Sequence, residues 1–423
     1  MKIKIDHIAK IEGHAGFVAD IADGNVVKAR LDVFEGARLL EGILQGRSYN
    51  EVSQITSRIC GVCPVVHNLT SLKALEAALG VIPSEQTILL RKLMMMGQIL
   101  NSHALHLFFF SLSDFFGIKN DLELIKKYPG RAADSLLLRG FGNKIIEVIG
   151  GRSIHPLTPV VGGFKKAPDQ EKLEEVLKDS GAALKAAVSL AKFFCSLKYP
   201  SFDRACNFVA LGLPGEYAIY DGSVKIGKET ESVSGFMPKI QEFQVKENPS
   251  AKRSEFQGKT YMVGSLARLN LNSKYLNAKA KAIFRDTNLI LPLCNPFYNI
   301  LAQAIELVQC VEESQQILEK TKDIDFESIQ PPPIELKKGK GFGAIEAPRG
   351  TLFYYYEVGA NGLIKNANII TPTAQNLARL EDDMVFYLPQ LTRGGKALCK
   401  EECEDLIKML VRAYDPCLTC ATH

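Results

Sequence analysis

Apolar residues recur along this chain with two different periods, and each period predicts its own kind of element. Residues 2–35 alternate apolar and polar side chains around Asp23-Gly24-Asn25, which predicts short antiparallel strands. Apolar residues at helical spacing predict four long helices, at residues 65–79, 86–116, 170–198 and 273–322. The run Gln330-Pro331-Pro332-Pro333 predicts the end of the last helix, because proline cannot continue one.

A further hairpin is predicted in the last quarter of the chain. Residues 350–358 are rich in β-branched and aromatic side chains, Asn361-Gly362 is a strong two-residue turn, and residues 363–371 return. Counting outward from that turn sets Pro348-Arg349 beside Pro372-Thr373 at the open end of the hairpin.

These elements predict a mainly α, α+β fold, with a large helical bundle as its core and antiparallel β-hairpins at its periphery. No linker, internal repeat or low-complexity segment divides the sequence, so we expect residues 1–423 to form a single domain. With 423 residues and 46% hydrophobic content, the chain can bury a large core.

Charge and composition exclude several classes of protein. The formal net charge is only +4 and both signs are interspersed, so we expect no nucleic-acid partner. The most apolar stretch, residues 89–116, contains too many charged and polar groups for a lipid-facing span, and no signal peptide is recognisable. We therefore predict no direct membrane insertion.

The ten cysteines fall into two groups. Without regular spacings they fit a reducing compartment better than a disulfide framework. Six stand apart from any motif and are predicted to be small buried hydrophobic residues: Cys195, Cys206, Cys294, Cys310, Cys399 and Cys403. The other four form two Cys-x-x-Cys pairs, Cys60 with Cys63 and Cys417 with Cys420. Four soft thiolates suit a thiophilic transition metal, while structural zinc or a dithiol redox site remain alternatives on spacing alone.

The first pair stands at the predicted start of a helix. Pro64 suits the first helical position, which makes Cys63 the N-cap, where the helix dipole and free N–H groups favour a thiolate. His67 follows one turn later and leans toward the N-terminus, so its imidazole is predicted to reach the Cys63 sulfur. A histidine simply packed in the core is the alternative.

The second pair follows a predicted helix end. Pro416 disfavours helix at Asp415, so the helix from about Glu401 should end at Tyr414 or Asp415. Cys417, Cys420 and His423 come at steps of three, which places them on one side of a turn or helical segment.

The residues around both pairs extend them into longer motifs. Arg58-x-Cys60-Gly61-x-Cys63 and Asp415-Pro416-Cys417-x-x-Cys420-x-x-His423 resemble the two signature motifs of the large, catalytic subunit of NiFe-hydrogenases. The resemblance runs through the whole chain, in Ile11-Glu12-Gly13-His14, Ser102-His103-Ala104-Leu105-His106, Gly151-Arg152-Ser153-Ile154-His155-Pro156, Glu346-Ala347-Pro348-Arg349-Gly350 and Thr371-Pro372-Thr373. It implies the fold above and reversible heterolytic cleavage of H2 to protons and electrons. The opening residues look most like the cytoplasmic, cofactor-coupled branch, so we expect a cytoplasmic enzyme.

The resemblance also implies the metals. Cys60 and Cys417 would bind nickel terminally, while Cys63 and Cys420 would bridge nickel and an iron that carries carbon monoxide and cyanide. Glu41, His423 and the backbone carbonyl of Ile369 would hold Mg²⁺ or a similar divalent ion. A simple solvated helix charge remains the alternative for Glu41.

Five polar or loop residues receive roles at the metals by the same resemblance. Arg349 would present its guanidinium to hydrogen, and Asp114 and Asp415 would pair with it. Pro348 and Thr373 would line the iron ligands, with the Thr373 hydroxyl on a cyanide. An ordinary loop salt bridge is the alternative for Arg349.

Proton transfer and the remaining histidines complete the prediction. Glu12 would take a proton from Cys417, unless it is an ordinary surface glutamate. His103, His106 and His155 are predicted to be structural or to support other residues, not to bind metal.

The chain has no other cysteine cluster for an iron–sulfur centre and no glycine-rich nucleotide fingerprint. We therefore predict no flavin, nucleotide or iron–sulfur cluster here, and electrons must leave through another protein. The resemblance implies an iron–sulfur small subunit, then flavin and iron–sulfur subunits that pass electrons to NAD(P), a deazaflavin or ferredoxin. It also implies a maturation protease that removes a C-terminal extension, so a chain ending at His423 is similar to the processed form.

Three other functions stay open. A hydrogen-sensing regulatory subunit would keep the same ligands. A quinone-pocket subunit of a respiratory complex would lack the metal, and the four cysteines and His423 argue against it. A zinc-stapled interaction protein would leave Glu12 and Arg349 unexplained.

Overall fold

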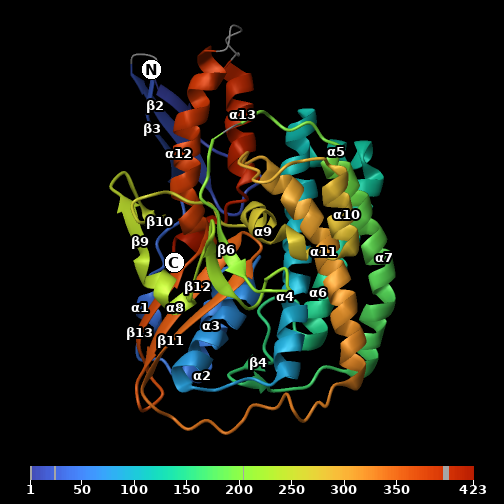
Figure 1. The fold of residues 1–423 in the computed structure, drawn as a ribbon. Coiled ribbons are helices and arrows are strands. Elements are labelled where there is room, and N and C mark those ends of the chain that lie inside the picture. Colours follow the sequence, from blue (N-terminus) through green and yellow to red (C-terminus); the bar gives the residue numbers. More distant parts are fainter. Residues whose placement is uncertain (1, 23–24, 203, 394–399) are drawn as a thin grey trace.

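The computed structural model describes residues 2–22, 25–202, 204–393 and 400–423. A bundle of helices forms one side, and small antiparallel sheets with further helices among them form the other, as Figure 1 shows, so the predicted mainly α, α+β class is confirmed. The bundle consists of α4 (Glu85–Leu105), α6 (Pro129–Gly150), α7 (Gln170–Cys195), α10 (Ala278–Asp286) and α11 (Tyr298–Lys320). Apolar residues from Ile5 to Ala421 form one large buried core, and a second, smaller buried cluster includes Val209, Phe236 and Phe353.

The remaining helices lie around the sheets or at the edge of the bundle. They are α1 (Leu40–Leu44), α2 (Tyr49–Thr56), α3 (Pro64–Leu79), α5 (Asp121–Lys127), α8 (Val233–Phe236), α9 (Ser265–Asn272), α12 (Pro372–Arg393), α13 (Lys400–Ala413) and α14 (Leu418–Ala421). Of these, α12 packs on the strands β3 (Asn25–Val33) and β10 (Asn248–Phe256) and stands beside α13 (Figure 1).

Five small sheets, all antiparallel, occupy the other side of the described structure. Their strands are β1 (Lys2–Ile5), β2 (Ala15–Ala22) and β3 (Asn25–Val33); β4 (Pro159–Val160) and β5 (Gly163–Phe164); β6 (Val209–Gly212), β7 (Ser223–Ile226) and β8 (Glu229–Glu231); β9 (Ile240–Val245) and β10 (Asn248–Phe256); and β11 (Gly339–Ala347), β12 (Gly350–Val358) and β13 (Ile364–Ile370). The first sheet confirms the strands predicted at residues 2–35, while Asp23-Gly24 lie outside the described residues.

Three of the four predicted helices are confirmed. They correspond to α3, to α7 and to α4, which continues through a π-helical turn at His106–Ser111 and a 3-10 segment at Leu112–Phe116. The helix predicted at 273–322 was wrong, because Pro292 and Pro296 interrupt it and separate α10 from α11. The predicted stop at residues 330–333 was also misplaced, since α11 ends at Lys320.

The predicted hairpin is present, with its register confirmed along most of its length. Opposed pairs run from Phe353 with Ile370 to Glu357 with Asn366, as the count from Asn361-Gly362 predicted. The register then shifts by one residue near the turn. Because α12 begins at Pro372, Pro372 and Thr373 belong to the start of a helix and are not paired in the hairpin. They still lie beside Pro348-Arg349, because both pairs line the same cavity.

Three glycines of β11 let α3 lie directly on the strand. A Cβ added at Gly341 would come within 2.0 Å of the Ala74 carbonyl oxygen, and one at Gly339 within 1.9 Å of the Ala78 oxygen. Gly343 meets the same helix. Backbone therefore packs on backbone, which fixes the start of α3, and with it Cys63, relative to the end of β11.

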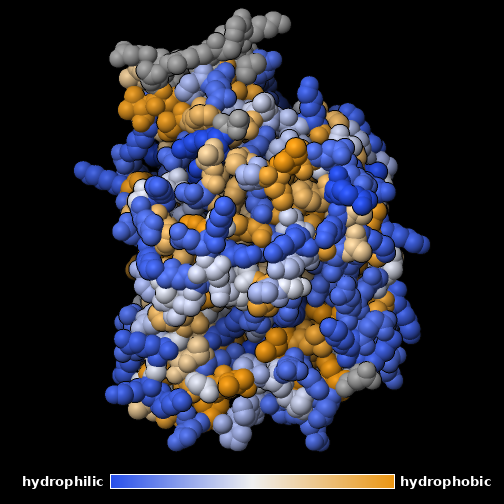
Figure 2. Space-filling model, in the orientation of Figure 1, coloured by the Kyte–Doolittle hydropathy of each residue, from blue (hydrophilic) through white to orange (hydrophobic). Residues whose placement is uncertain are grey.

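Figure 2 shows one face, on which hydrophilic residues predominate and apolar residues form small separate groups. None of the helices in the described part of the chain has the length and apolar character needed to cross a bilayer.

Asp114 does not pair with Arg349, so that prediction was wrong. The π-helical turn and the 3-10 segment after α4 direct Asp114 toward α13, where its Oδ1 lies 2.5 Å from Arg412 Nη1. Its Oδ2 is buried without a hydrogen-bond partner, beside a cavity of about 320 Å³. Burial raises the pKa of this carboxyl from 3.8 to about 6.

Replacing Gly341 with alanine should destabilise the protein by at least about 2 kcal/mol, because the new methyl overlaps α3 backbone. Thermal unfolding of the purified protein measures this. Lys340→Ala is the matched control on the same strand, because Lys340 is exposed and its contact with Glu357 spans 3.9 Å. Equal melting temperatures for the two variants would contradict the close packing.

Replacing Asp114 with asparagine should change the pH dependence of stability. A raised folded-state pKa favours the folded protein at acidic pH, and this contribution is lost as pH rises through about 6. Asparagine does not titrate, so the melting temperature of Asp114→Asn relative to the unmodified protein should increase from pH 4 to pH 7. The change corresponds to roughly 2–3 kcal/mol at most. A relative melting temperature that falls over this range would contradict the raised pKa.

Candidate metal centre

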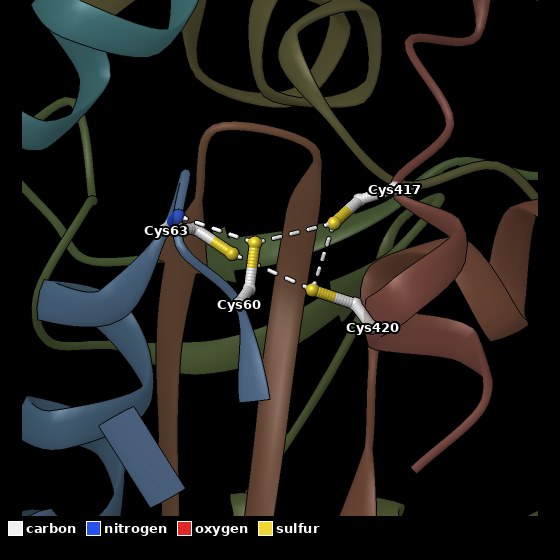
Figure 3. Close-up of side chains that lie close together, drawn as sticks. All are labelled: Cys60, Cys63, Cys417 and Cys420. Carbon is white, nitrogen blue, oxygen red and sulfur yellow. Dashed lines mark hydrogen bonds between the residues drawn. The ribbon is translucent and has the colours of Figure 1, made fainter. Parts of the chain in front are cut away.

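Four buried sulfur atoms from the two ends of the chain meet at one point. The Sγ atoms of Cys60, Cys63, Cys417 and Cys420 all lie within 4.8 Å of one another. The separations are 3.4 Å for Cys60–Cys417, 3.5 Å for Cys63–Cys420 and 2.9 Å for Cys417–Cys420. Figure 3 shows the side chains of the two pairs pointing toward each other.

The first pair is shaped by the start of α3. Pro64 occupies the first turn and Cys63 the N-cap, as predicted. The backbone N–H groups of Val62 and Cys63 donate to Cys60 Sγ at 3.3 and 3.4 Å. The hydrogen bond from the Cys417 thiol lowers the pKa of Cys60, whereas burial raises the pKa of Cys417.

The second pair follows a sharp break in the chain. The helix α13 ends at Ala413, next to the predicted break, and Asp415 adopts a positive φ of 49° before Pro416. The chain then turns into α14, whose ends carry Cys417 and Cys420. The prediction that these residues share one side of a turn is confirmed for Cys417 and Cys420, whereas the His423 imidazole contacts the Cys420 and Ile369 carbonyls instead of joining the sulfurs.

Arg38 joins the two cysteine segments, a role that nothing in the sequence suggested. Its Nη2 donates to the carbonyl of Ile59 at 2.8 Å and also to that of Thr419. Its backbone N–H donates to the Thr422 carbonyl at 2.8 Å. One side chain therefore ties the residue before Cys60 to the turn that carries Cys420.

Arg349 is buried and oriented by Asp415, as predicted. Its Nη2 donates to Asp415 Oδ1 at 2.9 Å and its Nε to the Asp415 carbonyl at 2.7 Å. Burial disfavours the charge, but Asp415 and the nearby thiols keep the pKa of Arg349 above its ordinary value. Its Nη1 is buried without a partner. Arg349, which lines the cavity beside the sulfurs, thus keeps one donor without a partner.

A small cavity of about 10 Å³ lies next to the sulfurs. Its lining brings together the predicted residues Pro348, Arg349, Thr373 and His67 with Cys63, Cys417 and Cys420. The Thr373 hydroxyl oxygen accepts the Cys417 N–H at 3.0 Å, which leaves its own hydrogen available to donate.

His67 contacts a different sulfur from the one predicted. Its Nε2 lies 3.5 Å from Cys420 Sγ rather than against Cys63, and its Nδ1 lies 2.7 Å from the Tyr354 hydroxyl. Burial lowers its pKa to about 3, so the imidazole is neutral. Tyr354, which lies within the predicted strand β12, orients the ring.

Glu12 lies between the sulfurs and the surface. Cys417 Sγ donates to its Oε2 at 3.1 Å, and the Thr419 N–H and hydroxyl donate at 3.1 and 2.7 Å. The Leu418 N–H also donates to the Glu12 carbonyl at 3.0 Å. The half-buried carboxylate is therefore fixed against the thiol, as the sequence predicted.

The three groups predicted to hold a divalent ion converge behind Cys420. His423 Nε2 lies 2.7 Å from the Ile369 carbonyl and 3.5 Å from Glu41 Oε1. Lys252, which the sequence did not suggest, places its ammonium 2.6 Å from Glu41 Oε1. Burial opposes ionisation, yet His423 and Lys252 together lower the pKa of Glu41 to about 2.

The predictions for the other histidines and for the isolated cysteines agree with the structure only in part. His155 donates to the Ser57 carbonyl at 2.9 Å, and His103 and His106 lie in buried networks apart from the sulfurs. Cys310 is buried as predicted. Four others agree with the prediction only in part, because they pack against the core but are partly exposed. They are Cys195, Cys206, Cys294 and Cys403. Cys399 lies outside the described residues.

The donor set suits a soft transition metal. Four sulfurs in one group match nickel, iron or zinc. A structural zinc site is closed, whereas these sulfurs border a cavity with an unpaired guanidinium N–H. That arrangement fits a metal with small acceptor ligands.

Comparison with known proteins agrees with this geometry. The model of the nickel-dependent hydrogenase family matches residues 38–135 and 218–423. The chain is 35% identical over its full length to subunit alpha of sulfhydrogenase 1 from Pyrococcus furiosus, 98% of which is covered. It is 26% identical to subunit beta of the NAD-reducing hydrogenase HoxS from Cupriavidus necator, with 100% and 94% covered.

A solved structure has the same fold. The NAD+-reducing NiFe-hydrogenase in its H2-reduced state superposes with a TM-score of 0.88 at 28% identity, covering 100% of this chain and 99% of that one. The chain therefore belongs to the nickel-dependent hydrogenase family, as a catalytic large subunit.

Proposed function

We propose that this subunit cleaves H2 reversibly into protons and electrons at a nickel–iron centre held by Cys60, Cys63, Cys417 and Cys420. The observation that supports this most is the group of four buried sulfurs beside the unpaired Nη1 of Arg349. All four thiolates would be ligands of this centre. When bound, the centre would supply heterolytic cleavage and accept the electrons.

Arg349 and Thr373 would hold the small ligands of iron. Carbon monoxide and cyanide are hydrogen-bond acceptors, and the free Nη1 of Arg349 and the free hydroxyl hydrogen of Thr373 are donors beside the cavity. Asp415 would keep the guanidinium aimed at the cavity, and Pro348 would line it.

Glu12 would carry the proton away. Its Oε2 lies 3.1 Å from Cys417 Sγ, within range for direct transfer, and the half-exposed side chain leads toward solvent. The two Thr419 donors would stabilise the carboxylate between transfers.

A Mg²⁺ ion would bind Glu41, the Ile369 carbonyl and His423. These are two oxygen donors and one imidazole that already meet at one point. A divalent ion there would compete with the Lys252 ammonium for Glu41.

Electrons would leave through an iron–sulfur small subunit. Gly61, between the first two cysteines, is exposed, so a partner can approach the metal ligands closely there. Further flavin and iron–sulfur subunits would pass the electrons to a soluble acceptor such as NAD(P), a deazaflavin or ferredoxin. We place this complex in the cytoplasm and expect a maturation protease to act on the subunit.

Metal analysis and infrared spectra of the purified complex test the proposal. We expect nickel, iron and magnesium, with carbon monoxide and cyanide stretching bands. Cys417→Ser should lose essentially all hydrogen uptake, because one of the four thiolate ligands is removed. Zinc alone without those bands, or near-normal activity of Cys417→Ser, would refute the nickel–iron assignment.

Replacing Glu12 with glutamine should leave the metal content unchanged but slow exchange between D2 and solvent protons by about 10²–10⁴-fold. Glutamine keeps the size of the side chain and loses the ability to carry the proton. Glu35→Gln is the matched control, since Glu35 lies nearby but binds His14, at 2.9 Å, instead of Cys417. Unchanged exchange in Glu12→Gln would remove Glu12 from the route.

A further inference from the structure

Arg268 is a fully buried arginine of α9 that none of the predicted motifs includes. Its Nε and Nη2 donate to the two carboxylate oxygens of Glu306 at 2.6 and 2.7 Å, and its Nη1 donates to Glu346 Oε2 at 3.0 Å. The side chain thus links α11 of the bundle to β11 of the sheet, with all three nitrogens in use.

The same guanidinium also binds the backbone that leads into Arg349. Nη1 donates to the Ala347 carbonyl at 2.8 Å and Nη2 to the Pro348 carbonyl at 3.1 Å. The Asn376 amide donates to the next carbonyl, that of Arg349 itself, at 3.3 Å. Three consecutive carbonyls are therefore held by side chains outside the sheet.

The charges around Arg268 keep it in this place. Burial would raise the pKa of Glu306, but Arg268 and His103 outweigh it and lower that pKa below its ordinary value. His103 Nε2 lies 2.8 Å from Glu306 Oε2, and the Tyr217 hydroxyl donates to Oε1 at 2.7 Å. Each Glu306 oxygen thus has at least two partners, so the carboxylate that binds Arg268 is itself held in place.

Arg349 depends on this backbone for the direction of its side chain. Asp415 fixes Nε and Nη2, while Nη1 is left free beside the sulfurs. The position of Nη1 then depends on the backbone of Arg349, that is, on its Cα position and on the orientation of its peptide group. The peptide that precedes Arg349 has its carbonyl on Arg268.

We infer that Arg268 is a positioning residue for hydrogen cleavage, acting through the backbone of residues 347–349 on the guanidinium of Arg349. This rests on the role proposed above for Arg349. Only a planar guanidinium can bind two carboxylates and two carbonyls at once, because it offers five N–H donors in a fixed fork. A lysine ammonium keeps the charge but has only three N–H donors on one nitrogen. It therefore cannot bind all of these carboxylates and carbonyls at once.

The test replaces Arg268 with lysine in the complete hydrogenase complex. We expect normal nickel content and hydrogen uptake reduced by between about 10-fold and 10²-fold, the usual effect of a shift of about 1 Å at a reacting centre. The infrared bands of the iron ligands should shift, because the free donor of Arg349 moves relative to them.

Arg253→Lys is the matched control. Arg253 is equally buried, pairs with Glu381 at 2.7 Å, and binds the carbonyls of Ala251 and Leu31 at 2.9 and 3.1 Å. None of these partners lines the cavity beside the sulfurs. Arg253→Lys should lower the melting temperature to a similar extent while the infrared bands stay in place.

A double substitution shows whether Arg268 acts on hydrogen cleavage through Arg349 or by keeping the whole protein folded. If Arg268 acts through Arg349, Arg268→Lys should reduce uptake little further in an Arg349→Lys background. A full additional loss there, unshifted bands, or activity equal to that of Arg253→Lys would overturn the inference.

A second variant covers the case in which Arg268→Lys does not fold. Glu346→Gln keeps the shape of the side chain but weakens its hold on Arg268 Nη1, so the bands should shift in the same direction by less. Unshifted bands in this variant would overturn the inference too. A wild-type complex without nickel or without the bands would instead refute the proposed function, and with it the role of Arg349.

Discussion

Direct contact between the backbones of α3 and β11 sets the geometry on which the metal centre depends. The helix begins at Cys63, and the strand leads to Arg349, so their separation determines how far the sulfur lies from the guanidinium. Glycines on the strand face bring the two elements closer than any side chain would allow. Close packing of this kind transmits displacements, so residues far from the metal share control of its surroundings.

Two buried arginines near the end of β11, Arg268 and Arg349, differ in how completely their donors are bound. Every nitrogen of Arg268 is bound, whereas Arg349 keeps one nitrogen unpaired. Leaving a buried donor without a partner costs about 1–3 kcal/mol. The fold bears this cost at one side of the cavity, where the ligands of a bound metal would accept the hydrogen bond. The fully bound arginine stabilises the backbone that carries the incompletely bound one.

Local patterns in the sequence predicted local features well. The Asn361-Gly362 turn set the register of β12 and β13, and Pro64 and Pro416 marked the boundaries beside both cysteine pairs. Longer patterns were less reliable, since the apolar spacing of residues 273–322 continued through two prolines that divide the helix. The resemblance located the sulfurs, Arg349 and Glu12 correctly in space but misassigned the partner of Asp114. Arg38, Lys252 and Arg268 were missed because only tertiary packing brings them to the site.

The link that Arg38 makes between the two cysteine segments bears on the order of assembly. With the carbonyls of Ile59 and Thr419 on one guanidinium, and Leu418 bound to the Glu12 backbone, contacts within the protein hold the two cysteine segments side by side. Ile59 and Thr419 lie far apart in the sequence, so this link can form only after the last residues of the chain have packed against the rest of the fold.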